Sequence, residues 1–190
     1  MKNIILGSQS PRRRELMAGL DCPFTAVSID ADESFPAQLK AGDIPLYIAR
    51  AKARAYGKPL GKDDVLITSD TIVWLEDRML GKPKDLADAR SMLLSLSGKT
   101  HQVYTAVCVI ADSKEYTLVD CTDVTFRDMT DEEIGYYVEK YKPLDKAGAY
   151  GVQEWIGYVG VSSMLGSYFN VMGFPIERVY LLLKDLGCLE

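Results

Sequence analysis

The chain has 190 residues, of which 47% are hydrophobic and 26% are charged, and its formal net charge is −5. This composition is typical of one globular domain with a substantial hydrophobic core, and the negative charge argues against a protein that binds nucleic acid polymers through a broad basic face. No apolar run approaches the roughly 20 residues that a helix needs to span a bilayer, so we expect no membrane segment.

Strands and helices alternate along the first half of the chain. Residues 4–6 predict a buried strand, and residues 11–20 predict a helix that Ser10 caps and that begins at Pro11. Apolar residues recur at helical spacing over residues 44–56. Two β-branched runs, at residues 65–67 and 71–74, predict two strands that the polar residues 68–70 separate.

The second half continues the same pattern. Residues 86–96 predict a helix that ends near Gly98, and residues 103–111 and 116–126 predict two strands that form a hairpin around residues 112–114. Thr130 and Glu133 form a capping box that opens a helix to about residue 141. A last helix is expected over residues 175–186, before Gly187.

This order of elements predicts an α/β fold, with a mixed sheet flanked by helices. No Pro-, Gly- or Ser-rich linker divides the sequence. We therefore expect one domain over residues 1–190, built as two lobes that share a central cleft.

The segment 8–14 reads S-Q-S-P-R-R-R and lies where a strand turns into a helix. Free backbone N–H groups at a helix N-terminus attract anions, and hydroxyl and guanidinium groups add donors that suit phosphate oxygens. Positive charge is unfavourable at this end of a helix dipole, so the arginines indicate an anionic ligand. The alternative is a solvated, arginine-rich first turn.

Asp70 lies in the polar group between the two expected strands. A carboxylate at a strand end in an α/β cleft can hold a metal ion or orient water, although an aspartate can also cap a turn. The acidic cluster of Asp30, Asp32 and Glu33 offers a second carboxylate for a metal, or else forms a solvated face.

Two further segments could contact a ligand. Lys82 lies in the turn G-K-P, where it could neutralise phosphate or simply be exposed. Residues 145–153 form a glycine-rich loop that ends at Gln153, whose amide matches the acceptor and donor edge of uracil or thymine. An ordinary loop is the alternative. Residues 166–175, punctuated by Gly and Pro, could close over a ligand or merely connect elements.

Several familiar catalytic motifs are absent from the sequence. His101 is the only histidine, and no G-x-S-x-G nucleophile elbow accompanies any serine, so a Ser-His-Asp triad is not expected. Neither a P-loop nor a G-x-G-x-x-G fingerprint occurs. We expect His101 to be structural and phosphate to be bound by another design.

Taken in order, these segments resemble the Maf family of nucleoside triphosphate pyrophosphatases. The matching segments are 8–13, 32–33, 51–53, 69–73, 81–83, 97–101, 145–153 and 166–175. The resemblance implies a fold like that of the inosine-triphosphate pyrophosphatases, dependence on Mg²⁺ or Mn²⁺, and a homodimer. It implies a nucleoside triphosphate as the partner, without nucleic acid or membrane.

The resemblance also assigns roles to matching residues. Asp70 is the implied catalytic proton acceptor, and Glu33 joins it at the metal. The implied phosphate ligands are Ser8, Ser10, Arg13, Lys52 and Lys82. Arg12, Thr71 and Gln153 resemble the branch that acts on dTTP and UTP.

Departures from the family pattern concern the base pocket more than the reaction. Ser69 stands where alanine is frequent, Glu154 and Trp155 follow Gln153 where glycine is common, and Phe169 and Phe174 occupy places where smaller or aliphatic residues are frequent.

The resulting hypothesis is hydrolysis of dTTP or UTP to the monophosphate and pyrophosphate. It requires the loop at residues 8–14, Lys52, Lys82 and Asp70 to converge on one pocket. The alternatives are a nucleotide-binding regulator of cell division with little catalysis, and a pyrophosphatase for a modified purine nucleotide. The four cysteines form no close pair, and the short apolar stretch at residues 1–7 does not suit a signal peptide, so a cytoplasmic location is expected.

Overall fold

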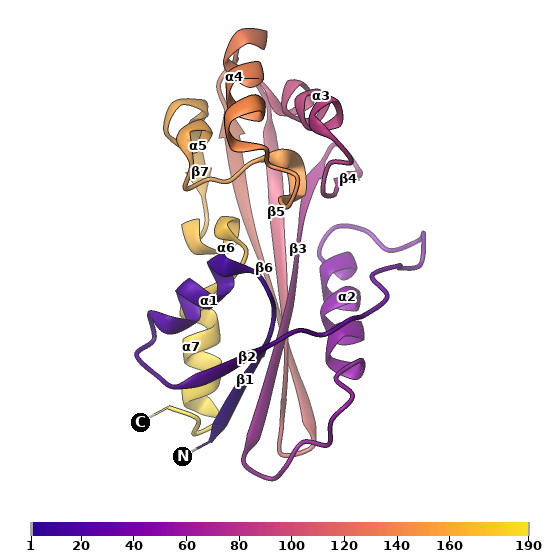
Figure 1. The fold of residues 1–190 in the computed structure, drawn as a ribbon, viewed down its shortest axis with the longest axis vertical. Coiled ribbons are helices and arrows are strands. Elements are labelled where there is room, and N and C mark those ends of the chain that lie inside the picture. Colours follow the sequence, from indigo (N-terminus) through magenta and orange to yellow (C-terminus); the bar gives the residue numbers. More distant parts are fainter. Residues whose placement is uncertain (1, 190) are drawn as a thin grey trace. The chain divides into compact units, whose positions relative to one another are not determined.

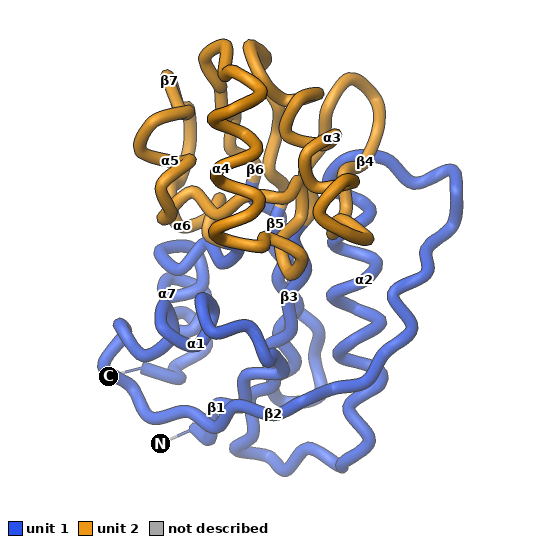
Figure 2. The backbone as a smooth tube through the Cα atoms, turned by 45° about the horizontal axis from the view of Figure 1, so that its top comes forward, with its two compact units in different colours: residues 1–71, 105–120, 173–190 blue, residues 72–104, 121–172 orange. Residues whose placement is uncertain are grey.

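The structure, a computed structural model, describes residues 2–189. It contains a seven-stranded sheet in the order β2-β1-β3-β5-β6-β7, with β4 paired to β3, and helices flank the sheet (Figure 1). The chain divides into two compact units (Figure 2). Unit 1 comprises residues 1–71, 105–120 and 173–190, and unit 2 comprises residues 72–104 and 121–172.

Unit 1 holds the N-terminal elements and the last helix. These are β1 (Asn3–Gly7), α1 (Pro11–Ala18), β2 (Phe24–Val27), α2 (Asp43–Arg54) and α7 (Ile176–Asp185). Three long strands, β3 (Asp64–Leu75), β5 (Thr100–Ala111) and β6 (Lys114–Phe126), contribute residues to both units.

Helices cover both faces of the sheet in unit 1, as Figure 1 shows. Leu6 packs in one apolar cluster with Met17 of α1 and Val179 of α7. Its neighbour Ile5 packs in another cluster with Ala49 of α2. Successive side chains of a strand point to opposite faces, so this alternation buries β1 on both sides and explains its continuous apolar sequence.

The connections around β1 diverge at its carboxyl end. β1 is parallel to β2 on one side and to β3 on the other, with Ile4 opposite Phe24 and Leu6 opposite Ile67. The chain leaves β1 through α1 toward β2 and then crosses back through α2 to β3. In open α/β sheets, ligands bind where connections diverge in this way.

Unit 2 is built mainly from helices and short strands. Its elements are β4 (Arg78–Leu80), α3 (Leu86–Leu96), α4 (Asp131–Tyr141), a 3₁₀ turn η1 (Ala147–Ala149), α5 (Trp155–Gly160), β7 (Val161–Leu165) and α6 (Tyr168–Met172). Leu93 of α3, Tyr137 of α4 and Ile156 of α5 pack with Phe126 of β6 in a single buried cluster.

Local signals in the sequence are confirmed. The Ser10 side chain accepts from the backbone N–H of Arg13, and Thr130 and Glu133 form both hydrogen bonds of a capping box. The hairpin between β5 and β6 turns at Asp112 and Ser113, which both have positive φ.

Other expectations are corrected. Residues 64–75 form one continuous strand, not two strands around a polar island, because the Thr68 hydroxyl is satisfied by donating to the carbonyl oxygen of Ala49 at 2.7 Å. Helix α1 ends at Ala18, two residues before the expected end. The short elements β2, β4, η1, α5, β7 and α6 were not expected, and α6 lies within the segment expected to be a loop.

Within residues 2–189, no helix is long and apolar enough to cross a membrane.

Candidate functional site

Lys52 of α2 joins two carboxylates in unit 1. Its Nζ lies 2.8 Å from Oδ1 of Asp70 and 2.9 Å from Oε1 of Glu33. The side chains of Lys52 and Asp70 are each 14% exposed, whereas that of Glu33 is 51% exposed. The structure thus brings together three of the predicted site residues from β3, α2 and the loop before α2.

The spacing of residues along α2 and along β3 brings Lys52 next to Asp70. Thr68 and Asp70 are two residues apart on β3 and therefore share a face. Ala49 and Lys52 are three residues apart on α2 and therefore share a face as well. The hydrogen bond from Thr68 to the carbonyl oxygen of Ala49 positions the helix, and Lys52 then meets Asp70 at the next contact.

The surroundings of Asp70 favour a basic carboxylate. Burial raises the pKa of Asp70 above its ordinary value, while the charges of Lys52 and Arg13 act in the opposite direction. The nearby Glu33 raises the pKa further. A carboxylate with a raised pKa accepts a proton from water more readily, which suits a general base.

Arg13 forms hydrogen bonds with residues around Asp70. Its Nη1 donates to the carbonyl oxygen of Ser69 at 2.8 Å, and its Nη2 donates to Oγ1 of Thr71 at 3.0 Å. Its Nε donates to the carbonyl oxygen of Gly173 at 2.8 Å. Burial lowers the pKa of this guanidinium. Arg13 therefore holds both neighbours of Asp70, a role that the sequence did not reveal, and its direct contact with phosphate stays a prediction.

Thr71 belongs to the same network. Its Oγ1 also lies 2.9 Å from Oγ1 of Thr105 and donates to the carbonyl oxygen of Gly173 at 3.3 Å. The proposed influence of Thr71 on substrate choice stays a prediction.

The loop after β1 has the form expected of an anion site. The backbone N–H of Ser10 donates to Oγ of Ser8 at 3.2 Å, and Oγ of Ser10 caps α1. Both hydroxyls act as acceptors in these contacts, so their own protons remain able to donate to an anion. Arg12 lies in the first turn of α1, and its charge acts on Arg13.

The loop also lies close to β3. A Cβ at Gly7 would lie 3.0 Å from Cγ2 of Thr68 and 2.4 Å from Cδ1 of Ile29. Glycine therefore lets the end of β1 and the serine loop lie close to the strand that carries Asp70, and a larger residue would have to displace Ile29.

The other two predicted site residues lie in unit 2. The backbone N–H of Gly148 donates to the carbonyl oxygen of Gly81 at 3.0 Å, which joins the Lys82 turn to the loop that ends at Gln153. Lys82 is exposed, and Oε1 of Gln153 is buried without a hydrogen-bond partner among the described residues. The convergence of Lys82 with the cations of unit 1 stays a prediction.

Asp70 and Glu33 form a carboxylate pair that fits a hard divalent cation. Both converge on one ammonium group, so their oxygens share a small space. Mg²⁺ is commonly held by one or two carboxylates together with water and substrate phosphates. Across residues 2–189 there is no group of three or more His, Cys, Asp or Glu side chains that could hold a metal ion. Asp32 makes a local turn instead, accepting from the backbone N–H of Ser34 at 2.9 Å.

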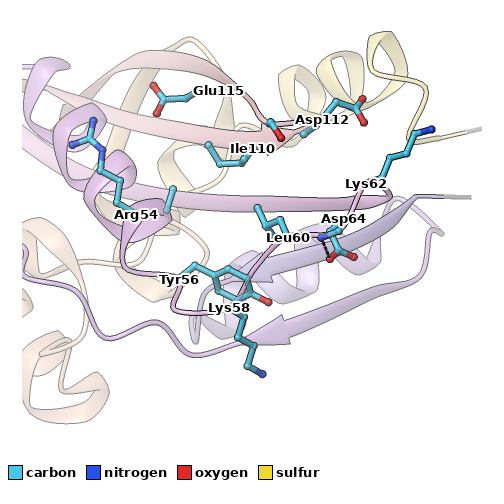
Figure 3. A pocket seen from close by; sticks show the side chains of 13 residues that line it. Arg54, Tyr56, Lys58, Leu60, Lys62, Asp64, Ile110, Asp112 and Glu115 are labelled. Atoms are coloured by element: carbon cyan, nitrogen blue, oxygen red, sulfur yellow. Dashed lines mark hydrogen bonds between the residues drawn. The ribbon is translucent and has the colours of Figure 1, made fainter.

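A pocket in unit 1 lies elsewhere (Figure 3). It has a volume of about 770 Å³, and its lining includes Arg54, Tyr56 and Lys62 but none of the predicted site residues. Its carboxylates at Asp112 and Glu115 are paired with cations. This pocket therefore contains none of the residues that the sequence predicts to carry the chemistry.

His101 is structural, as expected. It is fully buried, its Nε2 lies 2.7 Å from the hydroxyl of Tyr150, and its ring packs edge-on against Phe126. Burial lowers its pKa to about 4, so the ring is neutral at pH 7.

Comparison with known proteins identifies the family of the chain. The family profile described as Maf-like protein matches residues 3–186. A dTTP/UTP pyrophosphatase of Bacteroides fragilis (strain YCH46) is 54% identical over 184 residues, which cover 96% of this chain and 95% of that protein. A dTTP/UTP pyrophosphatase of Porphyromonas gingivalis (strain W83) is 50% identical over 188 residues, with 97% and 94% covered.

Solved structures add evidence on the fold alone. The Ham1 protein of Staphylococcus aureus has a TM-score of 0.54 and 15% identity, covering 97% of this chain and all of that one. This similarity confirms the expected α/β architecture.

Proposed function

Because the chain belongs to the Maf-like protein family, we propose that it is a nucleoside triphosphate pyrophosphatase that hydrolyses dTTP and UTP. Relatives of that name are 50% or more identical over nearly the whole chain. The observation that carries the proposal is the Lys52 ammonium, which lies within 2.9 Å of both the half-buried Asp70 and the exposed Glu33. Such a group of charges is costly in a partly buried site unless it serves a charged ligand.

The triphosphate chain would be bound mainly by the cations and by the loop after β1. The hydroxyls of Ser8 and Ser10 and the N-terminus of α1 offer donors to phosphate oxygens. Lys52 and Lys82 add positive charge, and Arg13 acts at least by fixing the strand around Asp70. These interactions orient the α-phosphorus and stabilise the charge that develops on the departing pyrophosphate.

Asp70 is the proposed general base. It accepts a proton from water, whose oxygen forms a bond to the α-phosphorus while the bond from that phosphorus to the bridging oxygen breaks. The products are the nucleoside monophosphate and pyrophosphate. Burial raises the pKa of Asp70, and this supports the role because it makes the carboxylate a stronger base.

Glu33 and Asp70 would hold a divalent cation, Mg²⁺ or Mn²⁺, which neutralises phosphate charge when bound. The recognition of the base is assigned to Arg12, Thr71 and Gln153. The buried, unpaired Oε1 of Gln153 supports this assignment, since a base that donates an N–H would satisfy it.

We further propose that residues 1–190 act as one Maf-like domain in a cytoplasmic homodimer. The edge strand β7 supports self-association, because no charged residue occurs between Glu154 and Glu177. Leu165 and Tyr158 in this segment are 75% and 78% exposed. An uncharged edge can pair with the same edge of a second copy without like-charge repulsion. Light scattering of the wild-type chain and of Leu165→Lys tests this, with a monomeric wild type as the contrary result.

The activity is tested by measuring pyrophosphate release from UTP and dTTP, with Mg²⁺ and with a chelator. We expect Asp70→Asn to lower kcat by at least about 100-fold, as expected for loss of a general base. Asp64→Asn is a matched control on the same strand, since its carboxylate accepts from Asn3 and Gly61.

Two results would contradict the proposal. A folded Asp70→Asn protein that turns over UTP normally removes the assigned base. A wild-type chain that binds UTP but releases no pyrophosphate favours a nucleotide-binding regulator instead.

A further inference from the structure

One phenol in unit 2 forms hydrogen bonds with residues on both sides of Gln153, namely with the backbone of Gly151 and with the side chain of Glu154. Tyr137 of α4 is fully buried. Its oxygen accepts from the backbone N–H of Gly151 at 3.0 Å, and its O–H donates to Oε2 of Glu154. Gln153 lies between these two attachment points.

An ion pair between Lys146 and Glu154 adds a further contact in this part of the loop. Nζ of Lys146 lies 3.3 Å from Oε1 of Glu154 and 2.9 Å from Oδ1 of Asp145, and Lys146 is 8% exposed. The same side chains pack on Gly151, where a Cβ would lie 2.9 Å from Cδ of Glu154 and 3.0 Å from Cε of Lys146. The last residues of the loop thus have little freedom to move.

The arrangement is hard to explain by stability alone. A buried lysine with carboxylate partners usually stabilises a protein no more than apolar residues of similar volume would. Meanwhile Gln153, which lies in the chain between Gly151 and Glu154, keeps a buried acceptor with no partner among residues 2–189. A buried acceptor without a donor is costly unless a ligand supplies one.

We propose that Tyr137, Glu154 and Lys146 are positioning residues that fix the Gln153 amide and thereby select a base with an N–H donor. This inference rests on the proposed function, because it takes Gln153 as the base-reading residue. None of the three residues is assigned a contact with the reacting phosphate. They act through Gln153, so their effect belongs to substrate selection and KM rather than to kcat.

The test compares UTP with its N3-methylated analogue, which cannot donate the N–H. Tyr137→Phe removes both hydrogen bonds and keeps the ring in its core position. We expect the ratio of kcat/KM for UTP to that for the analogue to fall by about three- to ten-fold, the loss typical of one hydrogen bond. The kcat for UTP should stay within about two-fold.

Tyr136→Phe is the matched control. It makes the same change one residue away on α4, where the hydroxyl accepts from the exposed Lys140. Its selectivity ratio should equal that of the wild type. An unchanged ratio in Tyr137→Phe would overturn the proposal. A purely structural role predicts that kcat/KM falls equally for both substrates, and the absence of any role predicts that neither value changes.

Glu154 gives a graded second measurement that does not depend on Tyr137. Glu154→Gln keeps an acceptor for the phenol and should retain most of the selectivity, whereas Glu154→Ala should lose as much as Tyr137→Phe. Equal losses in the two variants would contradict the proposal.

Failure of the proposed function is recognised separately. If the wild type does not hydrolyse UTP, the proposed function fails. The positioning cluster is then judged from equilibrium dissociation constants for UTP and the methylated analogue in the same variants. Equal relative affinities in the wild type and Tyr137→Phe would overturn it.

Discussion

Arg13→Lys distinguishes two roles for Arg13. The sequence predicts a phosphate ligand, whereas the structure indicates a group that fixes the strand around Asp70. As a phosphate ligand, Arg13 should affect mainly KM, and lysine should replace it in part. As the group that fixes the strand around Asp70, it should affect kcat, since the guanidinium contacts Ser69 and Thr71 on either side of the carboxylate. Lysine cannot reproduce this planar fork.

The magnitude follows from the hydrogen bonds. Arg13 donates to the carbonyl oxygens of Gly173 and Ser69, each at 2.8 Å, and to Oγ1 of Thr71 at 3.0 Å. One ammonium group can retain about one of them. Each hydrogen bond from a charged donor contributes roughly 1.5–3 kcal/mol, so the two losses should cost about 3 kcal/mol in free energy of unfolding after allowance for relaxation. A displacement of about 1 Å at Asp70 lowers kcat by about 100-fold.

The assay is steady-state pyrophosphate release from UTP, combined with urea unfolding of the same preparation. Arg50→Lys is the control, because Arg50 forms only a peripheral ion pair with Glu115 and its side chain is 39% exposed. We expect a large loss of kcat in Arg13→Lys and near-normal behaviour in the control. A raised KM with unchanged kcat and unchanged stability would refute the positioning role.

Three other predictions follow from the buried charges and from one glycine. Lys52→Gln should move the acidic limb of the kcat/KM profile to higher pH, because Lys52 lowers the pKa of Asp70. Glu33→Gln should move this limb to lower pH, because Glu33 raises the same pKa. Shifts of the same sign in a pH–rate series would contradict this. His101 has a pKa of about 4 in the folded chain against 6.5 for the ordinary value, so the unfolded state binds the proton first. Stability is therefore retained above pH 6.5 and lost by about 3 kcal/mol as the pH falls to 4, and His101→Asn should flatten this dependence in urea titrations. Gly148→Ala should lower stability and raise KM for UTP, because φ is +68° and the new Cβ would lie 2.7 Å from a core valine; a normal melting temperature would argue against the strain.

Much of the fold was predictable because its signals are local. The Ser10 cap and the capping box at Thr130 mark helix starts that the structure confirms. The short strands β2 and β7 were missed because their pairing partners lie far away in sequence. The polar residues 68–70 also misled the prediction, since the partner that keeps Thr68 in a buried strand is a carbonyl of α2.

The charged residues of the candidate site could be predicted from the sequence, but some of their contacts could not. Charged side chains are visible in the sequence, so Lys52, Asp70 and Glu33 could be named from the resemblance before their contacts were known. The role of Arg13 in fixing the strand around Asp70 could not be predicted, because two of its acceptors are backbone carbonyls, which every residue type carries. The same limit hid Tyr137, whose contact with Gly151 is made through the backbone N–H.

In the proposed reaction, water attacks the α-phosphorus of a nucleoside triphosphate. Hydrolysis of UTP in ¹⁸O-labelled water, followed by mass spectrometry of both products, tests this position of attack directly. Attack at the α-phosphorus places one ¹⁸O atom in UMP and none in pyrophosphate. Label in the pyrophosphate, or formation of UDP and inorganic phosphate, would contradict it.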